Sequence, residues 1–162
     1  MKILVDADGC PVVDEAVAMA GTYRVPILLL CDTAHRMERE GAQTIVLSQG
    51  ADSVDIALAN RTQAGDVVVT QDYGLAALCL AKGARVLHQD GWEYTPDNID
   101  GLLLVRHTAG KLRRSGGRLR AIPKRTRAQD LAFCQLLEQV LEWERASRSS
   151  ERAGRRHMKE KH

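Results

Sequence analysis

The sequence predicts an α/β protein with a three-layer α/β/α architecture, in which a central, mostly parallel sheet of five strands is followed by added C-terminal helices. Two observations predict this class. Short apolar runs alternate with helical patterns through the first 87 residues, and this alternation is typical of parallel strands joined by right-handed crossovers. The run at 25–31 is apolar throughout, as expected of a strand that is buried on both faces.

The expected strands are short, and each is followed by polar or turn-forming residues. The first is the apolar run that begins at Lys2, ends in Asp6 and Asp8, and is stopped by Gly9 and Pro11. The other four expected strands cover residues 25–31, 44–47, 67–70 and 84–87. In a doubly wound sheet the first and fourth strands are neighbours at the point where the strand order reverses.

The helices are predicted from apolar residues that recur every three to four positions. Pro11 suits the first position of a helix, and Gly83 suits the residue just after the end of one. The polar segment 32–41 is expected to be a loop or a short helix. The expected helices cover residues 11–21, 51–60, 75–81, 97–114 and 129–145.

At 162 residues the chain is long enough for one domain with its own core. We expect this domain to cover residues 1–146, followed by a basic, disordered tail at 147–162 that lacks hydrophobic periodicity. The N-terminus has no signal-peptide pattern, and no apolar run approaches the roughly 20 residues needed to span a bilayer. A cytoplasmic protein without a membrane partner is therefore expected. The sequence leaves the oligomeric state open, with a homodimer as one option.

The near-neutral formal charge of +2 hides a strong asymmetry along the chain. Residues 1–105 contain seven Lys and Arg against fifteen Asp and Glu, whereas residues 106–127 contain nine basic residues and no acid. Such a split predicts an acidic core with a basic segment for a polyanion such as nucleic acid, although a solvated loop would have the same composition. The basic residues are Arg106, Lys111, Arg113, Arg114, Arg118, Arg120, Lys124, Arg125 and Arg127. The tail adds Arg152, Arg155, Arg156, Lys159 and Lys161 as nonspecific contributors.

Acidic residues follow the expected strands or begin the helices after them. They are Asp6, Asp8, Asp52, Asp55 and Asp72. The carboxyl ends of parallel strands meet at one edge of the sheet, so these side chains are expected to converge there. Carboxylates without Cys or His favour a hard cation, Mg²⁺ or Mn²⁺, which can activate water for attack on a phosphodiester.

Each carboxylate also has a purely structural interpretation. Asp8, Asp52 and Asp72 could each cap the N-terminus of the following helix. Asp55, one turn into its helix, could simply favour the helix dipole. Cys10 lies beside the acidic pair, and without a local base it is predicted to be a neighbour of the ligands rather than a nucleophile.

Three segments resemble the bacterial YaiI/YqxD family: DADGCPV at 6–12, GADSVD at 50–55 and GDVVVTQDYGLA at 65–76. The resemblance extends through Gly116 and Gly117 and the helix around Phe133. That family is grouped with PIN-like nucleases, so the resemblance implies a parallel sheet of strand order 3-2-1-4-5 that carries a carboxylate metal site. The D-x-D at 6–8 departs from the single first acid of PIN-like proteins, and Arg118 stands where family members often have Pro.

The resemblance also assigns roles to particular residues. Asp6, either Asp52 or Asp55, and Asp72 match the core acidic positions, and Thr70 matches the hydroxyl that often precedes the last acid. With Cys10 and Ser48, which follows the third expected strand, Thr70 is expected to lie beside the metal ligands and support them.

The favoured interpretation is a metal-dependent nuclease that hydrolyses phosphodiesters, with RNA as the expected substrate and water as the nucleophile. One alternative is a nucleic-acid-binding or regulatory module that is not an enzyme. Another is a phosphatase of the haloacid dehalogenase type, since Asp6 and Asp8 resemble its nucleophile and acid. Cys10 replaces the Thr usual in that motif, which argues against the phosphatase.

Overall fold

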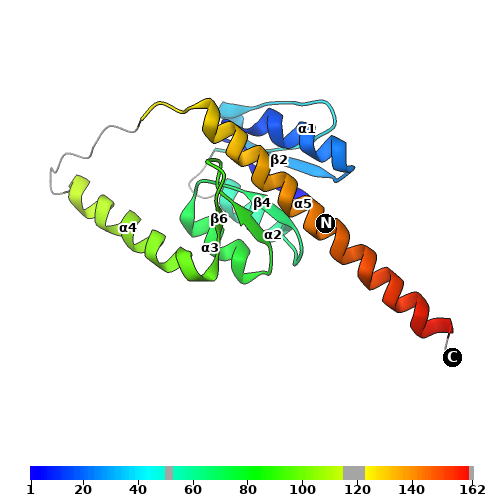
Figure 1. Cartoon of the computed structure of the whole chain (residues 1–162). Helices are drawn as coiled ribbons and strands as arrows, with labels where there is room; N and C mark the ends of the chain where they lie inside the picture. Colours follow the sequence, from blue (N-terminus) through cyan, green and yellow to red (C-terminus); the bar gives the residue numbers. More distant parts are fainter. Residues whose placement is uncertain (50–52, 115–122, 161–162) are drawn as a thin grey trace.

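A computed structural model describes residues 1–49, 53–114 and 123–160 and shows an α/β architecture (Figure 1). Its sheet has six strands in the order β3-β2-β1-β4-β5-β6. The first five strands pair in parallel, and β6 is antiparallel to β5. The strands are β1 (Ile3–Asp6), β2 (Ile27–Asp32), β3 (Gln43–Leu47), β4 (Val67–Val69), β5 (Arg85–Leu87) and β6 (Glu93–Tyr94). The predicted order 3-2-1-4-5 is therefore confirmed, with one short strand added.

Helices cover both faces of this sheet, which confirms the three-layer arrangement. Helices α1 and α5 pack on one face of the sheet and share a core with the side chains of β1 on that face, Ile3 and Val5. Helices α2, α3 and α4 share the other core, in which Leu4 of β1 is buried. The helices are α1 (Val13–Tyr23), α2 (Ser53–Arg61), α3 (Tyr73–Ala81), α4 (Pro96–Arg114) and α5 (Arg127–Glu160), with a short 3-10 helix η1 (Thr33–His35).

The central strands are apolar throughout because both of their faces are covered. Successive side chains of a strand point to opposite faces, so Ile3 and Val5 enter one core and Leu4 enters the other. All three are fully buried. Burial of a side chain of this size contributes roughly 1.5–3 kcal/mol, and the central strands are thus held firmly enough to position the groups at their ends.

Several element boundaries differ from the sequence prediction for local reasons. Strand β2 begins at Ile27 rather than residue 25, after Pro26, which has no N–H to donate to a sheet. Helix α1 begins at Val13, two residues after Pro11, and its C-terminal cap is Arg24 in the left-handed region rather than Gly21. Strand β6 was not predicted because two residues, Glu93 and Tyr94, are too few to show a periodic pattern.

Helix α5 is the largest departure from the predicted elements. Its amphipathic pattern predicts an end at Arg145, and the last of its buried residues is Leu141. The helix nevertheless continues to Glu160, so the described part of the segment expected to be disordered is helical. None of the helices in the described ranges is long and apolar enough to cross a membrane.

Candidate functional site

The candidate site is built at the carboxyl-terminal edge of the parallel strands, around Asp6. Asp6 is the last residue of β1, which lies between β2 and β4 in the sheet. Thr70 follows β4 directly and donates a hydrogen bond from Oγ1 to Oδ2 of Asp6 at 2.9 Å. The neighbouring ends of β1 and β4 thus bring a carboxylate and a buried hydroxyl together, as the strand order predicts.

Asp8 lies two residues beyond Asp6 and turns toward β2. Its two carboxylate oxygens accept the backbone N–H of Asp32, at 3.2 and 3.3 Å. Helix α1 starts at Val13, and its cap residue Val12 makes no side-chain cap hydrogen bond. The structural alternative that Asp8 caps this helix is therefore wrong, and Asp8 instead connects the ends of β1 and β2.

Asp72 does cap the helix that follows it. Its Oδ1 accepts the backbone N–H of Leu75 at 3.0 Å, and its own N–H donates to Oγ1 of Thr70 at 3.0 Å. The structural interpretation of Asp72 is thus confirmed. The same carboxylate also lies close enough to Asp6 to raise its pKa, so capping and a place at the site are compatible.

The remaining predicted ligands and their neighbours are at the same edge or outside the described residues. Asp55 lies in the first turn of α2 and also raises the pKa of Asp6. Asp52 lies outside the described residues. Ser48 is exposed just after β3. Burial raises the pKa of the Cys10 thiol to about 11, so this thiol stays protonated at neutral pH and is a poor nucleophile.

The electrostatics of Asp6 are the most informative property of the site. Burial raises its pKa from 3.8 to about 6. The hydrogen bond from Thr70 opposes this shift, whereas the nearby charges of Asp55, Asp8 and Asp72 add to it. In the described part of the chain, no Lys or Arg forms an ion pair with Asp6. Carboxylates gathered in this way repel one another unless a cation binds among them.

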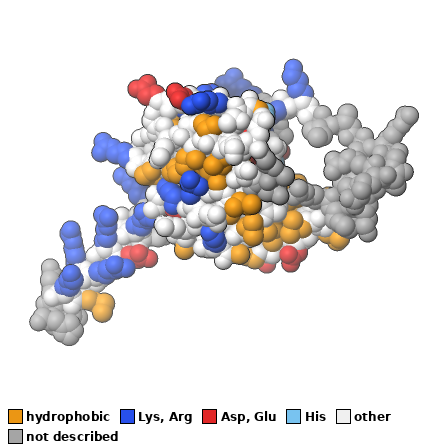
Figure 2. All heavy atoms as spheres, turned by 180° about the vertical axis from the view of Figure 1, so that it is seen from behind, with side chains coloured by type: hydrophobic (Ala, Val, Ile, Leu, Met, Phe, Trp, Pro, Cys, Tyr) orange, Lys and Arg blue, Asp and Glu red, His pale blue; other side chains and the backbone are white. Residues whose placement is uncertain are grey.

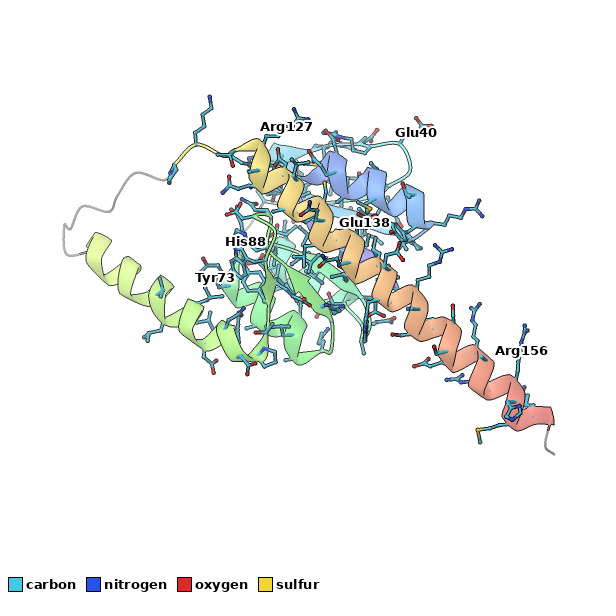
Figure 3. The ribbon with its side chains drawn as sticks, in the orientation of Figure 1. Glu40, Tyr73, His88, Arg127, Glu138 and Arg156 are labelled. Carbon is cyan, nitrogen blue, oxygen red and sulfur yellow. The ribbon has the colours of Figure 1, made fainter. Side chains whose placement is uncertain are left out.

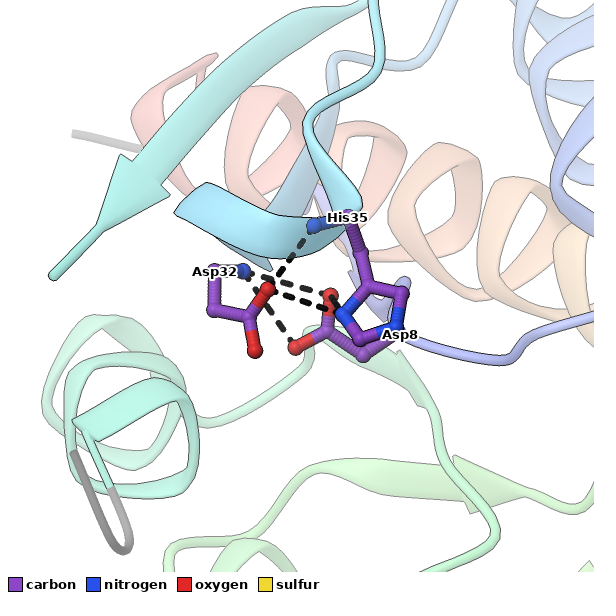
Figure 4. A group of neighbouring side chains, drawn as sticks. All are labelled: Asp8, Asp32 and His35. Carbon is purple, nitrogen blue, oxygen red and sulfur yellow. Dashed lines mark hydrogen bonds and ion pairs between the residues drawn. The ribbon is translucent and has the colours of Figure 1, made fainter. Parts of the chain in front are cut away.

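Two residues at this edge were missed by the sequence prediction, Asp32 and His35. Asp32 ends β2 and caps η1 by accepting the N–H groups of Ala34 and His35. Nδ1 of His35 lies 2.8 Å from the Asp32 carboxylate and 3.8 Å from that of Asp8 (Figure 4). The hydrogen bond between them lowers the pKa of Asp32 and raises that of His35.

These three side chains form a compact set of potential ligands. Asp8, Asp32 and His35 each offer one ligand atom, and these atoms all lie within 4.8 Å of one another. Within the described ranges this is the one group of three or more His, Cys, Asp or Glu that satisfies that criterion. Asp32 could have been found by the argument that identified Asp6, because it too is the last residue of a parallel strand. It was missed because it begins the polar segment 32–41, which was expected to be a loop or a short helix.

The predicted basic segment is described only at its end. Lys124 and Arg127 are exposed. The guanidinium of Arg125 donates to Asp90 at 2.6 Å, to Asp130 at 2.7 Å and to the carbonyl of Gln89 at 2.6 Å. Its charge is therefore used to tie the loop before β6 to the start of α5. The other predicted contacts have side chains outside the described residues: Arg106, Lys111, Arg113, Arg114, Arg118 and Arg120.

The fold and this edge define a class: a three-layer α/β protein with a carboxylate-lined site at the ends of its parallel strands. Comparison with known proteins then gives the family. The profile of the Uncharacterized BCR, YaiI/YqxD family matches residues 4–143, and the chain belongs to this family. The segment with the predicted acids and the first half of α5 lie within the match.

Individual relatives support this assignment. A UPF0178 protein of Exiguobacterium sibiricum is 50% identical over 141 residues, which cover 87% of this chain and 96% of the relative. A UPF0178 protein of Alkaliphilus oremlandii is 46% identical over 88% of this chain and 92% of its own length. A UPF0178 protein of Natranaerobius thermophilus is 47% identical over 87% of this chain and 96% of its own length. No solved structure matches the chain.

Proposed function

We propose that the protein is a metal-dependent nuclease of the cytoplasm that hydrolyses phosphodiesters, with RNA as its substrate and Mg²⁺ or Mn²⁺ as its cofactor. The observation that carries the proposal is the state of Asp6. This carboxylate is mostly buried at the end of a central strand, with a pKa of about 6 that burial and three neighbouring carboxylates have raised. A divalent cation is the ligand that would relieve this repulsion most directly.

The donor set fits a hard cation. Asp6, Asp8, Asp55 and Asp72 would supply carboxylate oxygens, which Mg²⁺ and Mn²⁺ prefer. Asp32 and His35 extend the set beside Asp8, and an imidazole next to carboxylates suits Mn²⁺ better than Mg²⁺. When bound, such an ion can activate water and stabilise the leaving oxygen of a phosphodiester.

The protein's own residues would orient this chemistry. Thr70 fixes Asp6 through one hydrogen bond and receives the N–H of Asp72 through another, so the two acids keep a defined relative position. Asp8 is likewise fixed by the backbone N–H of Asp32. Carboxylates held by rigid strand ends need little reorganisation when a cation binds, and such preorganisation favours catalysis.

The test is an RNA cleavage assay with Mg²⁺ or Mn²⁺ on the wild type, Asp6→Asn and Asp72→Asn. Asn caps a helix about as well as Asp, so Asp72→Asn keeps helix α3 while it removes the charge. We expect cleavage by the wild type, a loss of at least about a hundredfold in both variants, and weaker Mn²⁺ binding by both in calorimetry.

Two results would contradict the proposal. One is the absence of RNA and DNA cleavage by the wild type together with Mn²⁺ binding that Asp6→Asn leaves unchanged. The other is turnover of a simple phosphate monoester with a phosphoryl group trapped on Asp6, which would show the phosphatase chemistry of a carboxylate nucleophile.

A further inference from the structure

The distal half of helix α5 projects from the domain and buries no side chain in it. Leu141 is fully buried, but no residue from Glu142 to Lys159 is buried. In Figure 1 this segment runs out past the sheet to the C-terminus. A helix segment that buries no apolar stripe gains little from tertiary packing, so its side chains are available for another use.

The basic residues of this segment lie on one side of the helix. They recur at spacings of three or four residues, or are adjacent at one turn: Arg145, Arg148, Arg152, Arg155, Arg156 and Lys159. At about 100° per residue all six fall within an arc of roughly 100°, whereas Glu142, Glu144 and Glu151 fall outside it. We call these six residues the basic stripe. Figure 2 shows the basic side chains along the projecting helix, and Arg156 is labelled near its end in Figure 3.

The proximal part of the stripe forms one wall of a cleft. This cleft has a volume of about 880 Å³ and is lined by Arg145, Arg148 and Arg152 on α5. Arg24, between α1 and β2, lines it from the other side together with Val25. Four arginines thus line one open space, and a positively charged concave surface of this kind concentrates anions.

Arg24 occupies a backbone conformation that favours glycine. Its φ is 54°, and among the described residues it is the one non-glycine residue with a positive φ. A left-handed conformation costs a side-chain-bearing residue about 1–2 kcal/mol. Glycine would avoid this cost at the end of α1, so an arginine here places a cation at the cleft at some expense of stability.

The residues of the stripe form no ion pair with a carboxylate within the described part of the chain. The ion pairs of the described residues involve Lys2, Arg39, Arg85, Arg125 and two histidines, but neither Arg24 nor any residue of the stripe. Unpaired cations that are arranged in a line are suited to a partner whose negative charges are also arranged in a line.

We propose that the basic stripe and Arg24 bind the phosphate backbone of a double-helical nucleic acid, at a surface separate from the carboxylate site. From residue 145 to residue 159 the helix rises about 21 Å, so its six charges are spaced about 4 Å apart. A strand of a B-form DNA duplex has one phosphate per roughly 3.4 Å of axis. Five of the six are arginines, which bind phosphate through paired hydrogen bonds.

The composition of the segment disfavours other polyanionic partners. Single-stranded nucleic acid is bound through aromatic platforms on which bases stack, but residues 145–159 include no Phe, Tyr or Trp. A helix that lies on a membrane needs large apolar side chains opposite its basic face, and Met158 is the one large aliphatic residue between 145 and 159. A regular duplex backbone requires neither feature.

The proposed surface is independent of the proposed nuclease site. The cleft is lined by Met1, Val25 and Pro26, which precede β1 and β2, whereas Asp6 and Asp32 end these strands. The two surfaces therefore lie at opposite edges of the sheet. The stripe also begins after residue 143, where the family match ends, so it adds a feature beyond the matched region.

The test is a binding titration of the full chain with a fluorescein-labelled, blunt-ended DNA duplex in EDTA at several KCl concentrations. Arg148→Gln/Arg152→Gln removes two charges from the stripe and keeps good helix formers. Each phosphate contact contributes about 0.9 to the slope of log K against log salt. The slope of this variant should therefore be smaller than that of the wild type by about 1.8. If the affinities converge near 1 M salt, binding at 0.1 M should weaken roughly 60-fold.

The matched control is Arg39→Gln/Arg61→Gln, which removes two exposed arginines outside the stripe and should change the slope by less than about 0.5. Circular dichroism checks that α5 remains helical in each variant. Because EDTA removes any metal, the titration measures binding without metal-dependent cleavage, so a failure of the nuclease proposal leaves this result intact.

Three outcomes would overturn the proposal: equal salt slopes for the stripe variant and its control, binding of the single strand as tight as that of the duplex, or tighter binding to vesicles of phosphatidylcholine and phosphatidylserine than to the duplex.

Discussion

Replacing Asp6 by Asn should stabilise the metal-free protein at neutral pH. The carboxyl group of Asp6 has a pKa raised from 3.8 to about 6, chiefly by burial. Above pH 6 the native protein therefore holds a charge that the unfolded chain accommodates more easily. Asn is a neutral isostere that can still accept the hydrogen bond from Thr70, so the variant removes the repulsion without opening a cavity.

The size of the effect follows from the pKa shift. One pKa unit corresponds to about 1.4 kcal/mol, so the rise from 3.8 to about 6 corresponds to about 3 kcal/mol at pH 7. A chain of this length gains roughly 2–4 °C in Tm per kcal/mol, which gives a Tm higher by about 6–12 °C. As the pH falls through 6 to 4, the wild-type carboxyl becomes protonated in the native state, and the difference between the two proteins should fall below about 1 kcal/mol.

Thermal and urea unfolding of both proteins in EDTA, at pH 7 and at pH 4, measure this difference. Asp100→Asn is the matched control, because Asp100 is exposed on α4 and its replacement should change the free energy of unfolding by less than about 0.5 kcal/mol. With Mn²⁺ in excess the order should reverse, since the ion binds more tightly to the protein that keeps the carboxylate and stabilises it more. A variant no more stable than the wild type at pH 7, or equally stabilised at both pH values, would refute the reasoning.

Three further substitutions test the surroundings of the site. Thr70→Val removes a buried hydroxyl that donates to Asp6. In urea titrations it should lower the free energy of unfolding by about 1–3 kcal/mol, and it should raise the pKa of Asp6 further. Thr70→Ser keeps the hydroxyl and should leave both quantities near their wild-type values. Gly91→Ala should lower the free energy of unfolding by several kcal/mol, seen as a lower Tm, since φ is +88° and the new Cβ would lie 2.5 Å from Ala132. Gly101 lies on α4 with open space around it, so Gly101→Ala should instead raise the free energy of unfolding by roughly 0.5–1 kcal/mol. Arg125→Met should lower stability by about 1–3 kcal/mol by breaking its two carboxylate hydrogen bonds while leaving the salt dependence of duplex binding unchanged, in contrast to the stripe variant.

The sheet could be predicted from the sequence because its strands are buried on both faces. Leu4 and Leu29 are each fully buried, and such runs of apolar residues are recognisable without any partner. The order of the first five strands was implied by the resemblance to the YaiI/YqxD family, and the observed sheet confirms it. Strand β6 could not be predicted in this way. It has two residues, too few to show a pattern, and its pairing with β5 depends on the turn at Gly91.

The site could be predicted where it depends on strand ends and not where it depends on loops. Asp6 and Asp72 were expected at one edge and are close enough to interact. His35 could not be placed, because its approach to Asp8 requires the turn after β2 to fold back as η1. Helix α5 could be found but not its end, since the periodicity that predicts a helix stops where the burial stops, near Leu141.

The most direct test of the central claim is anomalous diffraction from crystals of this protein soaked in Mn²⁺. The claim is that the carboxylates at the ends of β1, β2 and β4 hold a divalent cation. We predict an anomalous peak within coordination distance, about 2.2 Å, of carboxylate oxygens of Asp6 or Asp8, which Asp6→Asn weakens. A structure in which Mn²⁺ binds only elsewhere, and the oxygens of Asp6 and Asp8 contact no ion, would contradict it.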